Sequence, residues 1–382
     1  MKTIAFILWT NGLEYDDRVR KETRSLQELG NYEIKIFAVS GDNKRGTGIT
    51  SYGIPYELID LPLRNSLGKS RLSQICKSIQ MYCRIIKRVR KFDLLWIIDD
   101  QPWLFPLAAR KKMVWDLHEI PAALIGCRFK NFLFRMMTRR CSAVIHANQE
   151  RLEYLVKEGI IRDGRKHDFI RNFPDNEWMA GATLPCVEFQ DFQKWLGDHE
   201  YIYIQGINNS NRFPYETLSA VLEAKKTKAV VIGDFSSKVK QQLEDKYGQI
   251  GEFVYFAGQV NQAVTAPFIG NCKFSMVFYS TETANNRLCE PNRLFQCLAF
   301  GKPAIVGNNP TMANLISEHN NGIVLASSGG CIEENVAAIH KMNERYEEYQ
   351  KHAEACRKEY MWESQSHNFL AILGINNSTN AI

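Results

Sequence analysis

The sequence lacks any run of about 18 uncharged apolar residues, the length that a membrane-spanning helix requires. Its ten cysteines include no C-x-x-C pair, so their pattern predicts neither a zinc site nor a dithiol redox centre. The first apolar run, residues 3–9, is not followed by a small-residue cleavage site, and we interpret it as a buried strand rather than a secretion signal. These absences favour a cytoplasmic protein with reduced thiols.

Strong charge of one sign is also missing. The net charge of +6 is too small to indicate a nucleic-acid-binding protein. Two segments, residues 64–91 and 128–140, nevertheless combine basic and apolar residues with no acidic residue. Within residues 71–89 the apolar positions recur at near-helical spacing, which predicts either a core-facing helix with a solvated basic back or a surface that binds anionic lipid. On the second interpretation the protein works at the inner face of the membrane.

Short apolar runs rich in β-branched residues alternate with segments of helical periodicity along the whole chain. This alternation predicts an α/β protein built on parallel sheets with helices on both faces. At 382 residues the chain is long enough for two domains. The predicted strands are residues 3–9, 32–39, 94–99, 112–117 and 143–147, followed by 201–206, 229–234, 253–258, 274–279 and 303–307.

The alternation is interrupted by residues 174–199, where prolines and glycines lie among mixed residues, and we expect a linker there. The predicted domains are therefore residues 1–180 and 200–360. A C-terminal helix, residues 361–375, is expected to pack back on the first domain.

In parallel sheets, ligands bind beyond the carboxyl ends of the strands. Gly206, Gly233 and Gly258 each end a predicted strand of the second half, where glycine allows a ligand to approach the backbone closely. One such glycine alone is as consistent with an ordinary turn, but three in succession favour a nucleotide site. Arg212 follows Gly206 in a polar loop and is a candidate phosphate ligand, although an isolated loop arginine is more often solvated.

Residues 285–307 hold the densest group of candidate ligands. Pro291 is typical of the first turn of a helix that follows the strand ending at Tyr279, and the amino end of such a helix favours an anion. Arg293 offers a bidentate donor to a diphosphate, and Glu290 or Gln296 can accept hydrogen bonds from hydroxyls. The alternative is a capped surface helix without a ligand.

In the first half, polar residues follow three predicted strands. His118 and Glu119 come after residues 112–117, and Asp100 comes after residues 94–99. Gly12 and Asp17 belong to the loop after the first strand. Taken alone, a histidine at a strand end is more often structural than catalytic. Here it would face the second domain across a cleft, which favours a catalytic role.

With these residues assembled, the sequence resembles the GT-B glycosyltransferases, in which two Rossmann-like domains face each other across a cleft, and most closely the retaining family 4. The resemblance covers nearly the whole chain. Its motifs are a D-x-R-V helix start at Asp16, Arg18 and Val19, a D-x-H-E strand end at Asp116, His118 and Glu119, an N-x-P-D segment at residues 172–175, and P-N-[KR]-L-F…G-K-P at residues 291–303.

The sequence departs from the family pattern at two positions. The second glutamate of the family motif, which binds the ribose of the donor, is Gln296 here. The arginine that follows the first glycine of the second domain is Ile207, and the lysine five residues later corresponds to Arg212. The resemblance therefore implies that phosphate binding depends on Arg212, Arg293 and the helix end.

These observations predict transfer of a sugar from a nucleotide diphosphate sugar, preferably a UDP-sugar, to a glycan or lipid-linked acceptor, without a metal or other cofactor. Two alternatives are a nucleotide-sugar epimerase of the same fold and a non-catalytic nucleotide-sugar-binding module. The predicted catalytic residues are His118, Glu290 and Arg212. The predicted donor ligands are Gly206, Arg212, Gly233, Gly258, Tyr279, Asn286, Glu290, Pro291, Asn292, Arg293 and Gln296. The predicted acceptor-side residues are Gly12, Asp17, Asp100 and Glu119.

Overall fold

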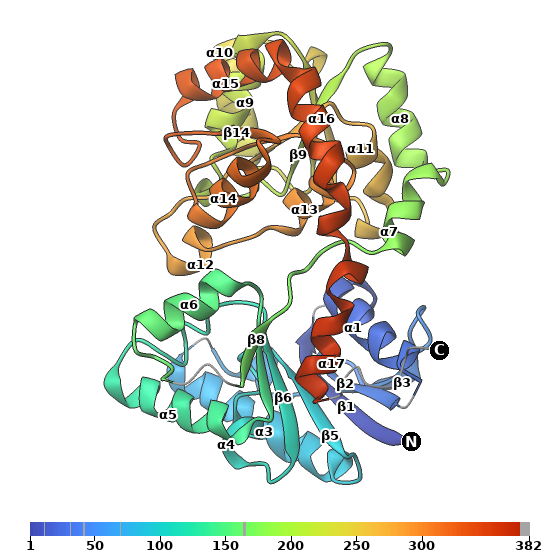
Figure 1. Ribbon diagram of the computed structural model, residues 1–382, viewed down its shortest axis with the longest axis vertical. Helices are drawn as coiled ribbons and strands as arrows, with labels where there is room; N and C mark the ends of the chain where they lie inside the picture. The colour runs from blue at the N-terminus through green and yellow to red at the C-terminus, as the bar shows by residue number, and fades with distance from the viewer. Residues whose placement is uncertain (11, 31, 41–42, 69, 163–165, 375–382) are drawn as a thin grey trace. The chain divides into compact units, whose positions relative to one another are not determined.

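A computed structural model describes residues 1–10, 12–30, 32–40, 43–68, 70–162 and 166–374 (Figure 1). The chain forms two compact units. The first contains Met1–Arg171 and the segment that begins at Gln365, and the second is Asn172–Ser364. Each unit is built on a largely or wholly parallel sheet, which confirms the predicted α/β class. No helix in the described ranges is long and apolar enough to cross a lipid bilayer.

The sheet of the first unit has the strand order β3-β4-β2-β1-β5-β6-β7-β8. All neighbouring strands are parallel except β3 and β4. The chain adds β2 and β4 on one side of β1 and then returns to place β5 on the other side, so the topological switch point lies between β1 and β5. The strands are β1 (Lys2–Thr10), β2 (Tyr32–Ser40), β3 (Gly46–Ile49), β4 (Pro55–Ile59), β5 (Leu94–Ile98), β6 (Lys112–Leu117), β7 (Ala143–His146) and β8 (His167–Phe169).

Polar side chains fix the starts of helices in the first unit. Asp16 accepts a hydrogen bond from the backbone amide of Val19 at the start of α1, and Asn148 accepts one from that of Arg151 at the start of α6. The helices are α1 (Asp17–Glu28), α2 (Leu63–Ser66), α3 (Arg71–Val89), α4 (Leu104–Ala108), α5 (Arg128–Arg140), α6 (Gln149–Lys157) and α17 (Ser366–Leu373).

The C-terminal helix α17 belongs to the first unit, where it contacts α1 (Figure 1). Its Phe369 is buried, with its ring 6.2 Å from that of Trp96 on β5. The helix is shorter than the predicted residues 361–375, because Trp362–Gln365 form a separate 3-10 turn. Residue 375 lies outside the described residues.

The sheet of the second unit is parallel throughout, with the order β11-β10-β9-β12-β13-β14. Its switch point lies between β9 and β12. The strands are β9 (Tyr201–Gln205), β10 (Lys228–Ile232), β11 (Val254–Gly258), β12 (Phe274–Val277), β13 (Ala304–Val306) and β14 (Gly322–Val324). The helices are α7 (Asn176–Ala180), α8 (Val187–Leu196), α9 (Pro214–Ala224), α10 (Ser237–Tyr247), α11 (Ala266–Gly270), α12 (Ala284–Arg287), α13 (Asn292–Ala299), α14 (Pro310–His319), α15 (Ile332–Glu344) and α16 (Tyr346–Cys356).

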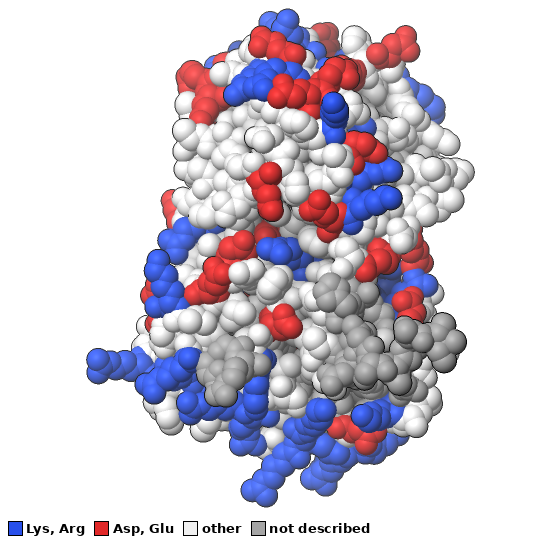
Figure 2. Space-filling model, in the orientation of Figure 1, with Lys and Arg blue, Asp and Glu red and all other residues white. Residues whose placement is uncertain are grey.

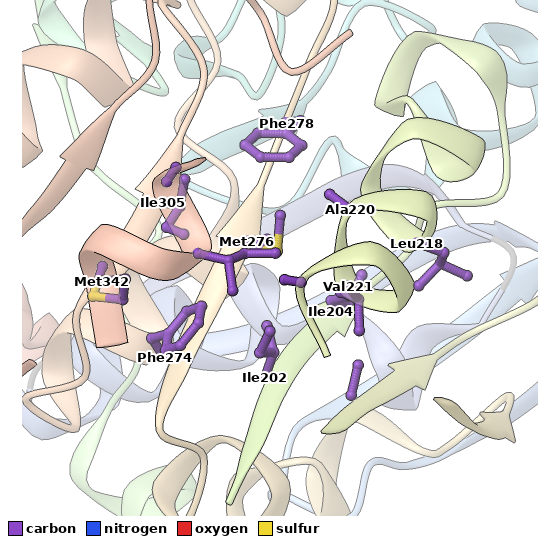
Figure 3. Close-up of a cluster of buried hydrophobic side chains, with 14 of the residues drawn as sticks. Ile202, Ile204, Leu218, Ala220, Val221, Phe274, Met276, Phe278, Ile305 and Met342 are labelled. Atoms are coloured by element: carbon purple, nitrogen blue, oxygen red, sulfur yellow. The ribbon is translucent and has the colours of Figure 1, made fainter. Parts of the chain in front are cut away.

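One face of this sheet forms an apolar core with helices α9 and α15 (Figure 3). Ile202 from β9 and Met276 from β12 meet Val221 of α9 and Met342 of α15, and all four are buried. Helices cover both faces of the sheet, so its strands are apolar on both sides, as expected for a parallel sheet. This packing fixes the strand ends that carry the candidate ligands.

The predicted linker is wrong for most of its length, because residues 176–180 and 187–196 form α7 and α8 within the second unit. Phe192 of α8 is fully buried, with its ring 4.8 Å from that of Tyr201 and 5.5 Å from that of Phe268. Trp178 and Leu196 are buried in the same cluster. The prolines and glycines that flank these two short helices suggest a linker, whereas the helical spacing of their apolar residues is what the fold uses.

Candidate functional site

A pocket of about 310 Å³ opens at the switch point of the second sheet. It is bounded by the end of β9, the segment after β12 and the start of α13, which is where an open parallel sheet binds its ligand. The lining residues are Gln205, Gly206, Arg212, Gln262, Tyr279, Pro291, Asn292, Arg293 and Gln296. Seven of these nine are predicted donor ligands, so the fold brings most of that predicted set together.

Tyr279 contacts both arginines of this pocket. The guanidinium carbons of Arg212 and Arg293 are each 4.9 Å from the centre of its ring, and Arg293 Nη1 donates to the Tyr279 hydroxyl at 3.3 Å. Arg212 Nη1 donates to the carbonyl oxygen of Gly206. Burial lowers the pKa of Arg212, and the nearby charge of Arg293 lowers it further. Two cations are therefore held close together, an arrangement that an anionic ligand would stabilise.

Arg293 is buried without enough partners for its guanidinium. The residue is 6% exposed, and its Nε and Nη2 atoms have no hydrogen-bond partner among the described residues. Leaving a charged donor buried and unsatisfied is costly, and a ligand that accepts hydrogen bonds from it would remove that cost. A phosphate group, with several acceptor oxygens, matches this requirement.

Gly206 leaves room for the arginines at the end of β9. Its φ of +64° lies in the left-handed region, and a Cβ atom there would lie 2.7 Å from Arg212 Nη1. The amide of Gly206 donates to Ile232 O at 2.8 Å, and that of Gly233 donates to Gly258 O at 2.7 Å. The three predicted strand-end glycines are therefore linked through adjacent backbone bonds, although Gly233 and Gly258 do not line the pocket.

The helix α13 directs its amino end at the pocket. Pro291 lies just before the helix in extended conformation, rather than in its first turn as predicted, and Asn292 is the first helical residue. The first backbone amides of a helix have no partner within it and carry the positive end of its dipole. Gln296, one turn into the helix, is buried and lines the same pocket. The arrangement can therefore hold an anion next to a neutral side-chain amide.

Besides Gly233 and Gly258, two further predicted donor ligands, Asn286 and Glu290, do not line the pocket. Asn286 lies on α12, where its carbonyl accepts a hydrogen bond from Asn309 Nδ2 at 3.0 Å, and Glu290 lies in the segment between α12 and α13. Sequence reasoning missed Gln205 and Gln262. Gln205 directly precedes Gly206 at the strand end, a position that could have indicated it, whereas nothing in the sequence singles out Gln262.

In the first unit His118 belongs to a cluster of charged groups in which Asp116 is buried and His118 and Asp99 are partly exposed. Its Nε2 lies 3.0 Å from Asp116 Oδ2, its Nδ1 lies 3.5 Å from Asp99 Oδ2, and its amide donates to Asp99 Oδ1 at 3.1 Å. Its carbonyl accepts a hydrogen bond from Arg151. Asp99, which directly follows β5, has a φ of +61°, an uncommon conformation for a residue with a side chain. Such backbone strain is concentrated at functional sites.

The charges of this cluster determine the protonation states of His118 and Asp116. Burial lowers the pKa of His118, but the carboxylates of Asp99 and Asp116 outweigh it and raise the pKa to about 9. His118 is therefore an imidazolium at neutral pH. Burial raises the pKa of Asp116, but Arg18 and His118 outweigh it and lower the pKa. A charged histidine between two carboxylates is a hydrogen-bond donor and not a general base.

The predicted acceptor-side residues do not form one group, although Asp100 and Glu119 are near enough for their charges to interact. Gly12 lines a small pocket of about 180 Å³ near β1 and β4. Asp17 pairs with Arg20 at 2.8 Å and with Lys21 at 2.7 Å, so these charges account for it without a ligand. Asp100 lies after β5, where burial raises its pKa and the charges of Asp99 and Glu119 add to the effect.

The surface formed by α3 and α5 is both apolar and basic. Leu72, Ile75 and Ile79 of α3 are 76%, 44% and 48% exposed, and Phe129 and Phe132 of α5 are 69% and 56% exposed. The short helix α4 contacts both α3 and α5. Figure 2 shows Lys and Arg side chains gathered over this part of the first unit.

Several basic residues of α3 are not available to a ligand. Lys77, predicted on the polar side of the helix, is buried and donates to Gly68 O at 3.2 Å. Arg84 pairs with Asp60 at 2.6 Å, and Arg88 pairs with Glu57 at 2.7 Å. Met81, Ile85 and Val89 are buried. The second half of α3 is thus core-facing, while its first half exposes an apolar stripe.

Comparison with protein-family models and with curated proteins found no match. Solved structures, in contrast, align over nearly the whole chain. A glycosyltransferase from Rickettsia africae covers 99% of each chain with a TM-score of 0.73 and 14% identity. Sucrose-phosphate synthase from Thermosynechococcus elongatus covers 98% of each with a TM-score of 0.72 and 11% identity. HepE from Anabaena, solved in complex with UDP-glucose, covers 98% of this chain and 100% of its own with a TM-score of 0.71 and 14% identity.

These likenesses define the class of architecture: the chain has the GT-B fold, with its two parallel-sheet units. At 11–14% identity they establish the fold and leave the activity to be argued from the site.

Proposed function

We propose that this protein is a glycosyltransferase that moves a sugar from a nucleotide diphosphate sugar to a glycan or lipid-linked acceptor in surface polysaccharide synthesis. The observation that carries the proposal is the buried guanidinium of Arg293, whose Nε and Nη2 lack partners within a pocket at the switch point of the second sheet. A donor diphosphate would supply the missing acceptors. The GT-B fold, shared with solved glycosyltransferases, supports the same reaction class.

The leaving group of this reaction is a nucleoside diphosphate, and its developing negative charge controls the barrier. Arg212, Arg293 and the amino end of α13 would stabilise that charge without a metal or a covalent protein intermediate. Gln296 would accept a hydrogen bond from a ribose hydroxyl or donate one to it. A UDP-sugar is the favoured donor, a choice supported by the UDP-glucose complex of HepE. Transfer of a hexose with retention of anomeric configuration is proposed from the resemblance to family 4.

We assign His118 to the sugar being transferred. As an imidazolium held by Asp116 through Nε2, it would donate from Nδ1, which lies 3.5 Å from Asp99 Oδ2, to a sugar hydroxyl, a role in which a positive charge is useful. Gly12, Asp17, Asp100 and Glu119 remain proposed acceptor-side residues, with Asp100 favoured by its raised pKa.

We further propose that the protein is cytoplasmic and binds reversibly to the inner face of the membrane. The support is the exposed apolar stripe of α3 and the two exposed phenylalanines of α5, next to basic residues that include Lys87, Arg90 and Lys91. Apolar side chains of this kind enter the headgroup region while basic ones contact anionic lipid. A membrane surface suits a lipid-linked acceptor.

The decisive experiment incubates the purified protein with a panel of UDP-, GDP- and CMP-sugars and measures nucleotide release with and without candidate acceptors. Acceptor-dependent release of one nucleotide supports the proposal. Conversion of a donor to its epimer without an acceptor would identify a GT-B epimerase. Nucleotide binding, seen as a thermal shift, without any turnover would identify a binding module.

A further inference from the structure

A second pocket in the first unit is lined mainly by basic residues, four of its seven being arginine or lysine. It lies between the C-terminal half of α5 and the start of β8 and has a volume of about 360 Å³. The lining residues are Arg135, Thr138, Arg139, Ile161, Arg162, Lys166 and His167. None of these seven residues is acidic. Such a volume suits a small charged group rather than a macromolecular segment.

Two of the cations are held in place by backbone carbonyls. Arg135 Nη1 donates to Gly159 O at 3.0 Å, and Lys166 Nζ donates to Arg139 O at 3.1 Å and Cys141 O at 3.2 Å. Carbonyl oxygens orient these side chains without cancelling their charge. The pocket therefore keeps a concentrated positive potential, which attracts anions.

His167 has a buried histidine behind it. His146 Nε2 lies 2.9 Å from His167 Nδ1, and the two rings are stacked with centres 5.2 Å apart. Burial lowers the pKa of His146 to about 3, so this ring is neutral. The neutral partner fixes the orientation of the His167 ring and leaves the positive charge of the pocket undiminished.

This pocket and the His118 cluster lie at opposite edges of the first sheet. Arg139 lies at the end of α5, just before β7, and His167 is the first residue of β8, so the pocket is at the amino-terminal edge of the sheet. His118 follows the carboxyl end of β6 at the opposite edge. An anion in this pocket therefore has a role separate from that of His118.

We propose that this pocket binds a phosphate group, carried by an anionic lipid headgroup or by a small phosphorylated molecule. Arginine and lysine are the side chains that recognise phosphate, through charge-assisted hydrogen bonds. The exposed Phe132 lies on the same helix as Arg139, seven residues earlier, which is two turns or about 10 Å along the axis. That apolar neighbour favours the lipid headgroup as the source.

The test uses the full-length protein and the double variant Arg139→Gln with Arg162→Gln, because neither side chain makes a hydrogen bond or ion pair with another of the described residues. Calorimetry measures binding of inorganic phosphate and of glycerol 3-phosphate. Sedimentation measures binding to phosphatidylcholine vesicles with and without phosphatidylglycerol. The charge-matched control is Lys226→Gln with Lys238→Gln on exposed positions of the second unit.

We expect the double variant to lose about ten-fold or more in affinity for at least one phosphate probe, while the control is unchanged. Loss of phosphatidylglycerol-dependent sedimentation identifies the lipid headgroup, and loss confined to the soluble probes identifies a small phosphorylated molecule. Phosphate binding that survives the double variant but disappears in Arg293→Ala belongs to the donor pocket and overturns the proposal, as does the absence of any effect. Nucleotide binding is measured separately, so failure of the proposed transferase activity would not be mistaken for failure here.

Discussion

The guanidinium of Arg18 donates two hydrogen bonds to the carboxylate of Asp116, from Nε to Oδ2 at 2.9 Å and from Nη2 to Oδ1 at 2.8 Å. The residues lie 98 positions apart, and both are buried. Arg18 Nη1 also donates to Ile170 O at 2.7 Å. One side chain thus joins the first helix, the strand that precedes His118, and the chain just before it leaves the first unit.

Asp116→Asn should strongly destabilise the first unit. The substitution keeps the shape of the side chain but leaves the buried charge of Arg18 without its main partner, and breaking such a pair costs about 3 to 5 kcal/mol. Urea denaturation measures the change. The control is Asp191→Asn, which removes an exposed pair with Lys194 and should cost less than about 1 kcal/mol. Equal effects of the two substitutions would contradict the importance of the buried pair.

The contribution of His118 to stability should depend on pH. Its pKa is raised in the folded protein to about 9, so the stabilisation is complete below the unfolded pKa near 6.5 and is lost as the pH rises through about 9. The difference in unfolding free energy between wild type and His118→Asn should shrink by up to about 3 kcal/mol between about pH 6 and about pH 9.5. A difference that stays constant across this window would show that the histidine does not gain its proton on folding.

The proposed catalytic role of His118 makes a separate prediction. His118→Ala should lower turnover much more than nucleotide affinity, because the contact would be made to the sugar near the transition state. Steady-state kinetics and calorimetry with the free nucleotide separate the two effects. If activity falls only in proportion to the fraction of folded protein, His118 is a structural residue of the cluster.

Arg293→Ala and Arg212→Ala should each weaken nucleotide binding about ten-fold or more, since charge-assisted hydrogen bonds contribute about 1.5 to 3 kcal/mol. Calorimetry with UDP and GDP measures this loss. The matched control is Arg287→Ala, an exposed position on α12 outside the pocket. Unchanged affinity in both pocket variants would refute the assignment of the donor site.

The stability of the ligand-free protein provides a second test of the role of Arg293. Its unpartnered Nε and Nη2 destabilise the ligand-free protein, so Arg293→Met should raise the free energy of unfolding by about 1 kcal/mol or more while nucleotide binding is lost. A general disruption of the pocket would lower both quantities.

Membrane binding should depend on the basic residues at the end of α3. Substituting Lys87, Arg90 and Lys91 with Gln should lower partitioning onto anionic vesicles about a hundred-fold, since each contributes about 1 kcal/mol near such a surface. Sedimentation at low and high salt measures the effect, with Lys238→Gln as a control on the second unit. No binding at low salt, or binding indifferent to the triple substitution, would favour a soluble acceptor.

The sequence was most informative where a strand lies in a continuous apolar run. The ten predicted strands correspond to β1, β2, β5, β6, β7, β9, β10, β11, β12 and β13. The strands β3 and β14 were missed because they begin with glycine, which is uncommon in strands, and β8 because two of its three residues are polar. Strand β4 begins with proline, which argues against a central strand, and Glu57 interrupts its apolar residues.

The candidate site was predictable to the extent that it follows strand ends. Gly206, Arg212, Tyr279 and Arg293 line one pocket because two strands that are neighbours in the sheet, β9 and β12, end there. That Tyr279 contacts both arginines depends on side-chain packing between segments about 70 residues apart, which no local pattern encodes. Glu290 does not line this pocket although it comes just before α13 in the sequence, because closeness along the chain does not decide which side chains line a pocket.

The return of α17 to the first unit affects how the protein can be synthesised. Phe369 packs against Trp96, and Gln365 exchanges hydrogen bonds with the backbone of Arg171, so the first unit is complete only when residues 365–373 are in place. These residues are translated after the entire second unit. During translation, the apolar surface of the first unit that α17 covers therefore stays exposed until the second unit has been synthesised. The nascent chain depends on α17 to cover the apolar surface of the sheet in the first unit.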